Sequence, residues 1–372
     1  MLKKLYDTLV RAVGSELWQT TGLRIDMTAD EVDQLMQEAN FQTVDGLVAN
    51  ALVRNNVPIG RRMVVKAMMT GETIIQRNKQ MDEVLRAFVE MMDAAQMPFV
   101  VVKGQTLNAL YPVVGERVCG DIDFWIRPTD YSRCRELIMQ KTGCLLPERM
   151  LLKETGFKWR DTKFELHTRL VGWSWPLHSH RWNRLMEESM SQAVRRPVGE
   201  CNVPVLAPKE EIEYTFLHAF FHLLGGGIGL RQMCDIALLL HHHRGRYDGA
   251  RLMADLRRLG VERAFRAFAA LLTDYLSLPP DDLPTVLNDS DRRVQRDLVE
   301  QILIGGNFGK VLHKPIDIHR HRWRYKLDSM RLAALNAQRY YRLAPMEAAC
   351  ILPARLAVNI WLKMNGYVPP ND

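Results

Sequence analysis

The segment Phe99-Val-Val-Val-Lys103-Gly104 constrains the fold more than any other part of the chain, because its β-branched run interrupts a sequence that otherwise has helical periodicity. β-Branched residues favour strands, and the glycine that ends the run indicates a tight turn. A helix-like stretch follows through Tyr111, and the apolar segment 119–126, Cys-Gly-Asp-Ile-Asp-Phe-Trp-Ile, is typical of a second strand. The order strand, turn, helix, strand predicts an α+β unit.

Helical segments flank this unit on both sides. In residues 44–52 and 84–92 apolar side chains recur three and four positions apart, which is the helical period, and the same spacing returns from Pro208 onward. Thr28-Ala-Asp-Glu31 has the form of a capping box and predicts that a helix begins there. We therefore expect three regions, which are a helical region 1–96, a central α+β region 97–205 and a helical region 206–372.

The second half of the central region is expected to add a helix and a hairpin. Pro128 and Thr129 open a helix that runs from Tyr131 to Lys141, and two strands at 156–160 and 163–170 turn at Asp161-Thr162. Side chains alternate between the two faces of a strand. In the second strand of the hairpin, Phe164 and Leu166 therefore share one face, and Glu165 and His167 share the other.

Asp121 and Asp123 are separated by one residue of a predicted strand, so both carboxylates point to the same face. Two such carboxylates repel each other unless a cation lies between them. Hard oxygen ligands suit Mg²⁺ or Mn²⁺, with substrate phosphates completing the coordination shell. The spacing alone is not specific, because Asp289-Ser-Asp291 repeats it in a polar stretch to which we assign no role.

The surroundings of Asp121 and Asp123 add the other parts of a phosphate and metal site. The preceding strand ends in Lys103-Gly104, where the glycine allows a backbone to approach a phosphate closely and the lysine supplies a positive charge. Arg117 adds another cation four residues before Asp121. We expect Lys103, Gly104 and Arg117 to contact a nucleotide, and we expect Glu165 on a neighbouring strand to complete a metal triad.

This arrangement matches a known family. Val102-Lys103-Gly104, Arg117-x-x-Gly120-Asp121-Ile-Asp123 and Phe164-Glu165-Leu-His167 together resemble the nucleotidyltransferase superfamily with the DNA polymerase β type palm, most closely its uncharacterised bacterial branch. The resemblance covers residues 97–170 by motif and continues more loosely through 218–240. It implies an α+β fold, in which a nucleotidyltransferase palm with a mixed sheet and helices is embedded in largely α-helical N- and C-terminal regions.

The resemblance also implies residue roles and an activity. Asp121 and Asp123 would bind both metal ions, Glu165 would bind the catalytic one, and the Gly104 turn would contact the nucleotide phosphates. The activity would be metal-dependent transfer of an NMP group from an NTP to an unknown acceptor, which can be a small molecule, a protein or an RNA. By position, Glu165 is expected to be either the general base or an inner-sphere guide for the acceptor. His167 is expected either to orient Glu165 or the phosphate, or to be a half-buried strand histidine. A palm that binds or assembles without catalysis remains an alternative.

The formal net charge of +7 is carried by the C-terminal end, since residues 310–372 contain eleven Lys or Arg and four acids. A basic end with interleaved aromatic residues can bind nucleic acid, anionic lipid or an acidic protein, or it can form a solvated helical face. No apolar run reaches the roughly 18 residues that a membrane-spanning helix needs. We therefore expect a cytoplasmic protein without a transmembrane segment.

Two other groups of polar residues are interpreted as structural. His218 and His222 have the i, i+4 spacing of metal ligands, but no glutamate follows His218 as a zinc protease helix would require. They are expected to form a structural pair beside the glycine-rich segment 225–229, which we interpret as a turn between helices. Arg231 and Asp235 have the i, i+4 spacing of an ion pair and are expected to pair with each other, with Arg231 reaching into the cleft as the alternative.

Overall fold

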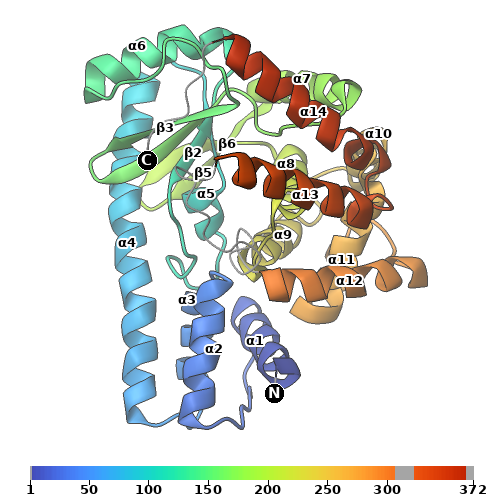
Figure 1. The fold of residues 1–372 in the computed structure, drawn as a ribbon. Coiled ribbons are helices and arrows are strands. Elements are labelled where there is room, and N and C mark those ends of the chain that lie inside the picture. Colours follow the sequence, from blue (N-terminus) through green and yellow to red (C-terminus); the bar gives the residue numbers. More distant parts are fainter. Residues whose placement is uncertain (1, 306–321, 366–372) are drawn as a thin grey trace.

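The computed structural model describes residues 2–305 and 322–365 (Figure 1). Four helices precede the first strand: α1 (Leu2–Leu17), α2 (Ala29–Phe41), α3 (Asp45–Arg54) and α4 (Arg61–Ala94). The capping box before α2 is present, because the Glu31 amide donates to Thr28 Oγ1 at 3.3 Å and the Thr28 amide donates to Glu31 Oε2 at 2.8 Å. The sequence therefore predicted the start of α2 correctly.

The central region forms a mixed four-stranded sheet, which confirms the predicted α+β fold. Its elements are β1 (Val100–Val102), α5 (Gly104–Asn108), β2 (Ile122–Trp125), η1 (Pro128–Asp130), α6 (Tyr131–Thr142), β3 (Glu154–Trp159) and β4 (Thr162–His167). The strand order is β1-β2-β4-β3, with β2 parallel to β4 and the other two pairs antiparallel. The predicted hairpin is present, but it turns at Arg160 and Asp161, whose φ angles are +47° and +60°, one residue earlier than predicted, because Thr162 already belongs to β4.

A two-stranded sheet and a group of helices follow. Their elements are α7 (Pro176–Ser189), η2 (Met190–Gln192), β5 (Val194–Val198), β6 (Cys201–Val205), α8 (Pro208–Gly225), α9 (Leu230–His242), α10 (Gly249–Arg258), α11 (Glu262–Leu276), η3 (Pro280–Asp282), α12 (Asp289–Gly305), α13 (Arg322–Tyr340) and α14 (Pro345–Met364). The glycine-rich segment 225–229 connects α8 to α9 as predicted. No helix within residues 2–305 and 322–365 combines the length and hydropathy needed to span a bilayer.

One face of the mixed sheet packs on the second half of α4. The ring of Phe88 on α4 lies 4.8 Å from the rings of Phe124 on β2 and Phe164 on β4, measured between centroids. These three side chains are fully buried. The hydrophobic core on this side thus fixes the positions of β2 and β4, and it leaves their opposite face to polar side chains. Residues 81–92 of α4 contribute to this core; the three predicted regions themselves stay a prediction.

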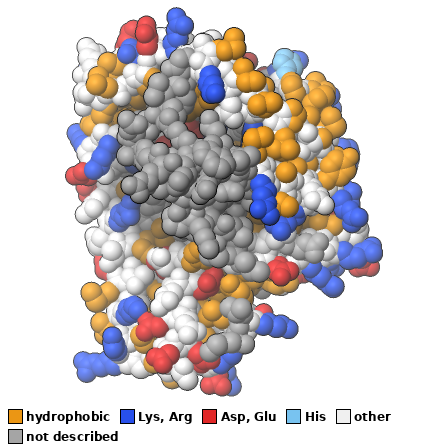
Figure 2. Space-filling view, in the orientation of Figure 1, with side chains coloured by type: hydrophobic (Ala, Val, Ile, Leu, Met, Phe, Trp, Pro, Cys, Tyr) orange, Lys and Arg blue, Asp and Glu red, His pale blue; other side chains and the backbone are white. Residues whose placement is uncertain are grey.

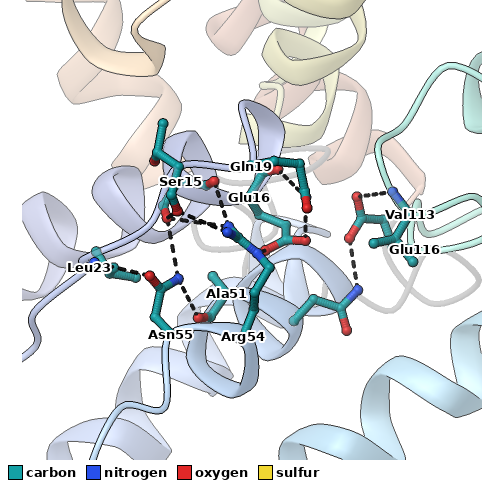
Figure 3. Close-up of polar contacts among 11 residues, drawn as sticks. Ser15, Glu16, Gln19, Leu23, Ala51, Arg54, Asn55, Val113 and Glu116 are labelled. Carbon is teal, nitrogen blue, oxygen red and sulfur yellow. Dashed lines mark hydrogen bonds and ion pairs between the residues drawn. The ribbon is translucent and has the colours of Figure 1, made fainter.

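A polar network fixes the loop before β2 against the N-terminal helices (Figure 3). The Glu116 carboxylate accepts from Asn50 Nδ2 of α3 at 2.8 Å, and Asn78 Nδ2 of α4 donates to the carbonyl oxygens of Gly115 and Arg117 at 2.6 and 2.7 Å. A Cβ atom on Gly46 of α3 would lie 2.3 Å from the Glu116 carbonyl oxygen. The loop therefore packs on α3 so closely that this position of α3 has to be glycine.

Candidate active site

The turn between β1 and α5 brings a lysine to the polar face of the sheet. Lys103 adopts a φ of +58°, which is uncommon for a residue with a side chain, and Gly104 follows with a φ of +48°. A Cβ atom on Gly104 would lie 3.1 Å from the backbone oxygen of Asp121, so a glycine allows the turn to approach the start of β2. Lys103 Nζ then lies 3.1 Å from Asp123 Oδ1.

The parallel pairing of β2 and β4 places two of the predicted carboxylates side by side. Asp123 is directly opposite Glu165 in the register, and both point away from the phenylalanine core. His167, two residues after Glu165 on the same face, lies with Nε2 2.8 Å from Asp123 Oδ1. One potential ligand atom from each of Asp123, Glu165 and His167 lies within 4.8 Å of the other two. The site is therefore compact enough to hold one metal ion.

Asp121 lies just outside this compact group. It precedes β2 and is partly exposed, and its Oδ2 atom is 3.7 Å from Lys163 Nζ. Lys163 also approaches Glu165, with Nζ 2.6 Å from Oε1. A lysine that the sequence analysis did not single out thus links two of the three predicted metal ligands. The alternation of β4 contained the signal, because Lys163, Glu165 and His167 follow one another at intervals of two residues and so share one face of the strand. The role of Asp121 as a metal ligand stays a prediction.

Charges compensate one another across the site. Burial opposes ionisation of Asp123, but the charge of Lys103 and the hydrogen bond with His167 outweigh it and hold the pKa of this carboxyl well below its usual value. Burial likewise opposes the charge of Lys103, yet Asp123 keeps the pKa of the amine above its usual value. For Glu165, burial is the dominant effect and raises the pKa. Asp123 is thus a permanent anion, whereas Glu165 binds a proton more readily.

Helix α8 closes the site with two histidines. His218 Nε2 lies 3.5 Å from Lys103 Nζ, and the ring centroids of His218 and His222 are 4.4 Å apart. Burial and the charge of Lys103 lower the pKa of His218, and they lower that of His222 to about 4. Both imidazoles are therefore neutral near pH 7. From the sequence, the two histidines were expected to form a structural pair. Their contact with Lys103 was not predictable, since it spans 115 positions of the chain.

Arg117 is buried in an ion pair with Asp235 of α9. Its Nε and Nη2 atoms each donate to Asp235 at 2.8 Å, and the Tyr111 hydroxyl donates to the same carboxylate at 2.8 Å. The predicted pair of Arg231 with Asp235 is therefore wrong. The two-pronged Arg117 guanidinium satisfies Asp235, and Arg231 Nη1 instead donates to the carbonyl oxygen of Val118 at 2.6 Å. The nucleotide contact of Arg117 stays a prediction, although its Nε and Nη2 donors are both engaged by Asp235.

The residues of the compact group fit a divalent cation. Two carboxylates and one imidazole offer a mixed oxygen and nitrogen donor set, which suits Mn²⁺ in particular, whereas an all-oxygen set is typical of Mg²⁺. Asp123 is an anion in this site, as a ligand has to be. In this structure Lys163 supplies the positive charge beside Glu165. A cation bound between Asp123 and Glu165 would neutralise the Glu165 carboxylate in its place.

The chain matches a known protein family over more than half of its length. A family model described as an uncharacterised nucleotidyltransferase matches residues 28–277, a span that contains the whole mixed sheet and α8. Among solved structures, the chain is similar to an antigenic nucleotidyltransferase-like protein from Paracoccidioides brasiliensis, with 10% sequence identity and a TM-score of 0.34 over 58% of this chain and 97% of that chain. A comparison with curated proteins found no match.

Proposed function

Because the chain belongs to the family of uncharacterised nucleotidyltransferases, we propose that it transfers an NMP group from an NTP to an acceptor in a reaction that requires Mg²⁺ or Mn²⁺. The observation that carries this proposal is the parallel register of β2 and β4. This register sets Asp123 beside Glu165, with Lys103 and His167 both in contact with Asp123. Paired carboxylates next to a lysine at a glycine turn are the parts that binding a metal–triphosphate complex requires.

The charge and position of each residue indicate its role in the proposed reaction. Asp123, Glu165 and His167 would hold the cation, with Asp121 as the additional predicted ligand. When bound, the cation supplies charge stabilisation to the phosphates and lowers the pKa of a coordinated hydroxyl. Glu165, whose pKa is raised by burial, is the general base that accepts the acceptor's proton.

Lys103 and Gly104 form the side of the site that would contact the phosphates. Lys103 neutralises Asp123, with Nζ 3.1 Å from Oδ1, and its ammonium group would bind the phosphates of a metal-bound NTP. Gly104 leaves room for a backbone approach, as a phosphate contact needs. His218 contacts Lys103 as a neutral ring and orients its amine. Lys103 and Gly104 are therefore the nucleotide-binding residues of this proposal.

Titration calorimetry of each NTP, with and without Mg²⁺ or Mn²⁺, tests the proposal. Wild-type protein should bind at least one NTP in a metal-dependent way, and Asp123→Asn should abolish that binding. Asp289→Asn is a matched control, because Asp289 opens the other Asp-x-Asp motif and is exposed at the start of α12. Equal loss in both variants, or metal-dependent binding that survives Asp123→Asn, would contradict the proposed site.

A second candidate function, a palm that binds without catalysis, is favoured by one observation. Lys163 Nζ lies 2.6 Å from Glu165 and 3.7 Å from Asp121, so its charge can replace a cation at this edge of the site. Lys163→Ala distinguishes the two candidates. If the charge of Lys163 replaces a metal ion, the Lys163→Ala variant should bind Mn²⁺ much more tightly than the wild type. The wild type should then show no metal-dependent NTP binding.

A further inference from the structure

The second half of α14 presents apolar side chains to solvent. The first half packs into the protein, where Ala348 and Ile351 are buried. In the segment 356–364 the exposed fractions of five apolar residues range from 46% to 81%: Leu356, Val358, Ile360, Trp361 and Met364. Figure 2 shows hydrophobic side chains gathered at the upper right of this face, where Figure 1 places α14. Single exposed apolar residues are ordinary, but a contiguous group marks a docking surface.

The exposed segment is amphipathic. Arg355, Asn359 and Lys363 are each four residues apart, so they form one polar stripe along the helix. The apolar side chains of the segment occupy the remainder of its circumference. A helix with a narrow basic stripe and a broad apolar face is typical of segments that lie in the interface of a lipid bilayer.

The preceding helix α13, which packs against α14, also exposes basic residues. Arg331, Arg339 and Arg342 on or just after α13 are exposed, and so are the apolar residues Leu335 and Tyr341 beside them. Between residues 330 and 365 the sequence contains one acid, Glu347. Glu347 is buried, where it accepts from the Ser174 amide at 2.6 Å and contacts His178 Nδ1 at 2.9 Å. Among the described side chains of residues 330–365, every exposed charge is therefore basic, and we name the exposed part of α13 and α14 the α13–α14 face.

We propose that the α13–α14 face docks on an anionic lipid bilayer, with the segment 356–364 lying in the interface. A bilayer provides both an apolar layer for Leu356, Ile360 and Met364 and negative headgroups for the arginines. A nucleic acid would provide only the negative charge. A second copy of the chain would bring two basic faces together. Glu347 ties the start of α14 to residues 174–178, so docking would orient the whole protein on the surface.

Vesicle sedimentation with the full chain tests this inference. The wild type should sediment with vesicles that contain phosphatidylglycerol, bind about tenfold or more weakly to pure phosphatidylcholine vesicles, and lose binding as salt is raised. Ile360→Asp/Trp361→Asp should weaken binding to the anionic vesicles by at least about tenfold. Leu145→Asp/Val286→Asp is the matched control, since these two apolar residues are 83% and 88% exposed on other parts of the chain. The control should bind like the wild type.

Several outcomes would overturn the inference. One is a wild type that does not bind anionic vesicles, and another is equal binding by both double variants. A concentration-dependent dimer that Ile360→Asp/Trp361→Asp dissociates would assign the face to a second copy. Nucleic-acid binding lost in the same variant, without vesicle binding by the wild type, would assign it to nucleic acid. Thermal melting of each variant checks that it is folded, and Met364→Asp, at an 81% exposed position, provides a milder variant.

Discussion

Replacement of Asp235 by alanine would leave the Arg117 guanidinium buried without its counter-ion. In the wild type, Arg117 makes two hydrogen bonds of 2.8 Å to Asp235, and the side chains are 5% and 4% exposed. Removal of one partner from such a buried pair costs about 3–5 kcal/mol. For a cooperative unit of 150–250 residues, each kcal/mol lowers the melting temperature by about 2–4 °C, so we expect a decrease of about 6–20 °C.

The triple variant Tyr111→Phe/Arg117→Met/Asp235→Leu provides the matched control. It removes both charges together with the Tyr111 hydroxyl, which would otherwise lose its acceptor. Apolar replacement of a buried ion pair is often neutral or stabilising, so the triple variant should regain most of the lost free energy of unfolding. Urea unfolding followed by circular dichroism measures both variants. An Asp235→Ala protein as stable as the wild type, or a triple variant as unstable as Asp235→Ala, would refute this reasoning.

The same triple variant tests the predicted nucleotide contact of Arg117. If Arg117 acts only by fixing the loop before β2, the stable triple variant should bind a metal–NTP complex as tightly as the wild type. If its guanidinium contacts the nucleotide, NTP affinity should fall although stability is retained. Calorimetry on a folded variant thus separates the two roles, which a single substitution that also destabilises the protein cannot do.

Three further predictions concern other positions. Gly104→Ala adds a Cβ atom 3.1 Å from the Asp121 carbonyl at a φ of +48°; we expect a loss of about 1–2 kcal/mol in stability, measured by urea unfolding, together with weaker NTP binding. His218→Ala removes the imidazole 3.5 Å from Lys103 Nζ. Loss of this long hydrogen bond to the Lys103 ammonium group should weaken NTP binding about two- to tenfold in calorimetry without changing metal binding. Burial raises the pKa of Glu116 to about 8, so the folded protein holds a proton that the unfolded chain loses near pH 4.5. This contribution to stability is complete below pH 4.5, and it falls by at most about 1.4 kcal/mol per pH unit until pH passes 8. In unfolding curves measured between pH 5 and 9, Glu116→Gln should remove this decrease in the free energy of unfolding with pH. An unchanged pH dependence in the variant would contradict the raised pKa of Glu116.

Local signals predicted most of the elements around the site. The β-branched run before Lys103, the capping box at Thr28 and the alternation in 163–167 all report short-range preferences of the backbone, and each corresponds to an observed element. The alternation also predicted that Glu165 and His167 share the polar face. Such patterns depend on the neighbours of a residue along the chain, and for this reason a single sequence contains them.

Partners from distant segments were not predictable in the same way. The contact of Lys103 with His218 and the pair of Arg117 with Asp235 depend on how α8 and α9 pack against the sheet. The i, i+4 rule favoured Arg231 for Asp235, because helix spacing makes that pair available. The buried, bidentate hydrogen bonds from Arg117 to Asp235 are stronger than the single pair that Arg231 could form on the helix surface. The spacing of residues along a helix indicates which ion pairs are possible, but the packing of the helices against the sheet determines which pair forms.

If the proposed function is correct, the charges of the site would couple metal binding to nucleotide binding. Asp121, Asp123 and Glu165 are balanced by Lys103 and Lys163, with the shortest contacts at 3.1 and 2.6 Å. A divalent cation added alone has to displace Lys163 from Glu165. An NTP brings negative charge that both lysines can bind, and it releases the carboxylates for the cation. Each ligand would therefore make the other bind more tightly, and by linkage the two effects would be equal. Through this reciprocity, a site that carries its own positive charges would select a metal–triphosphate complex over either component.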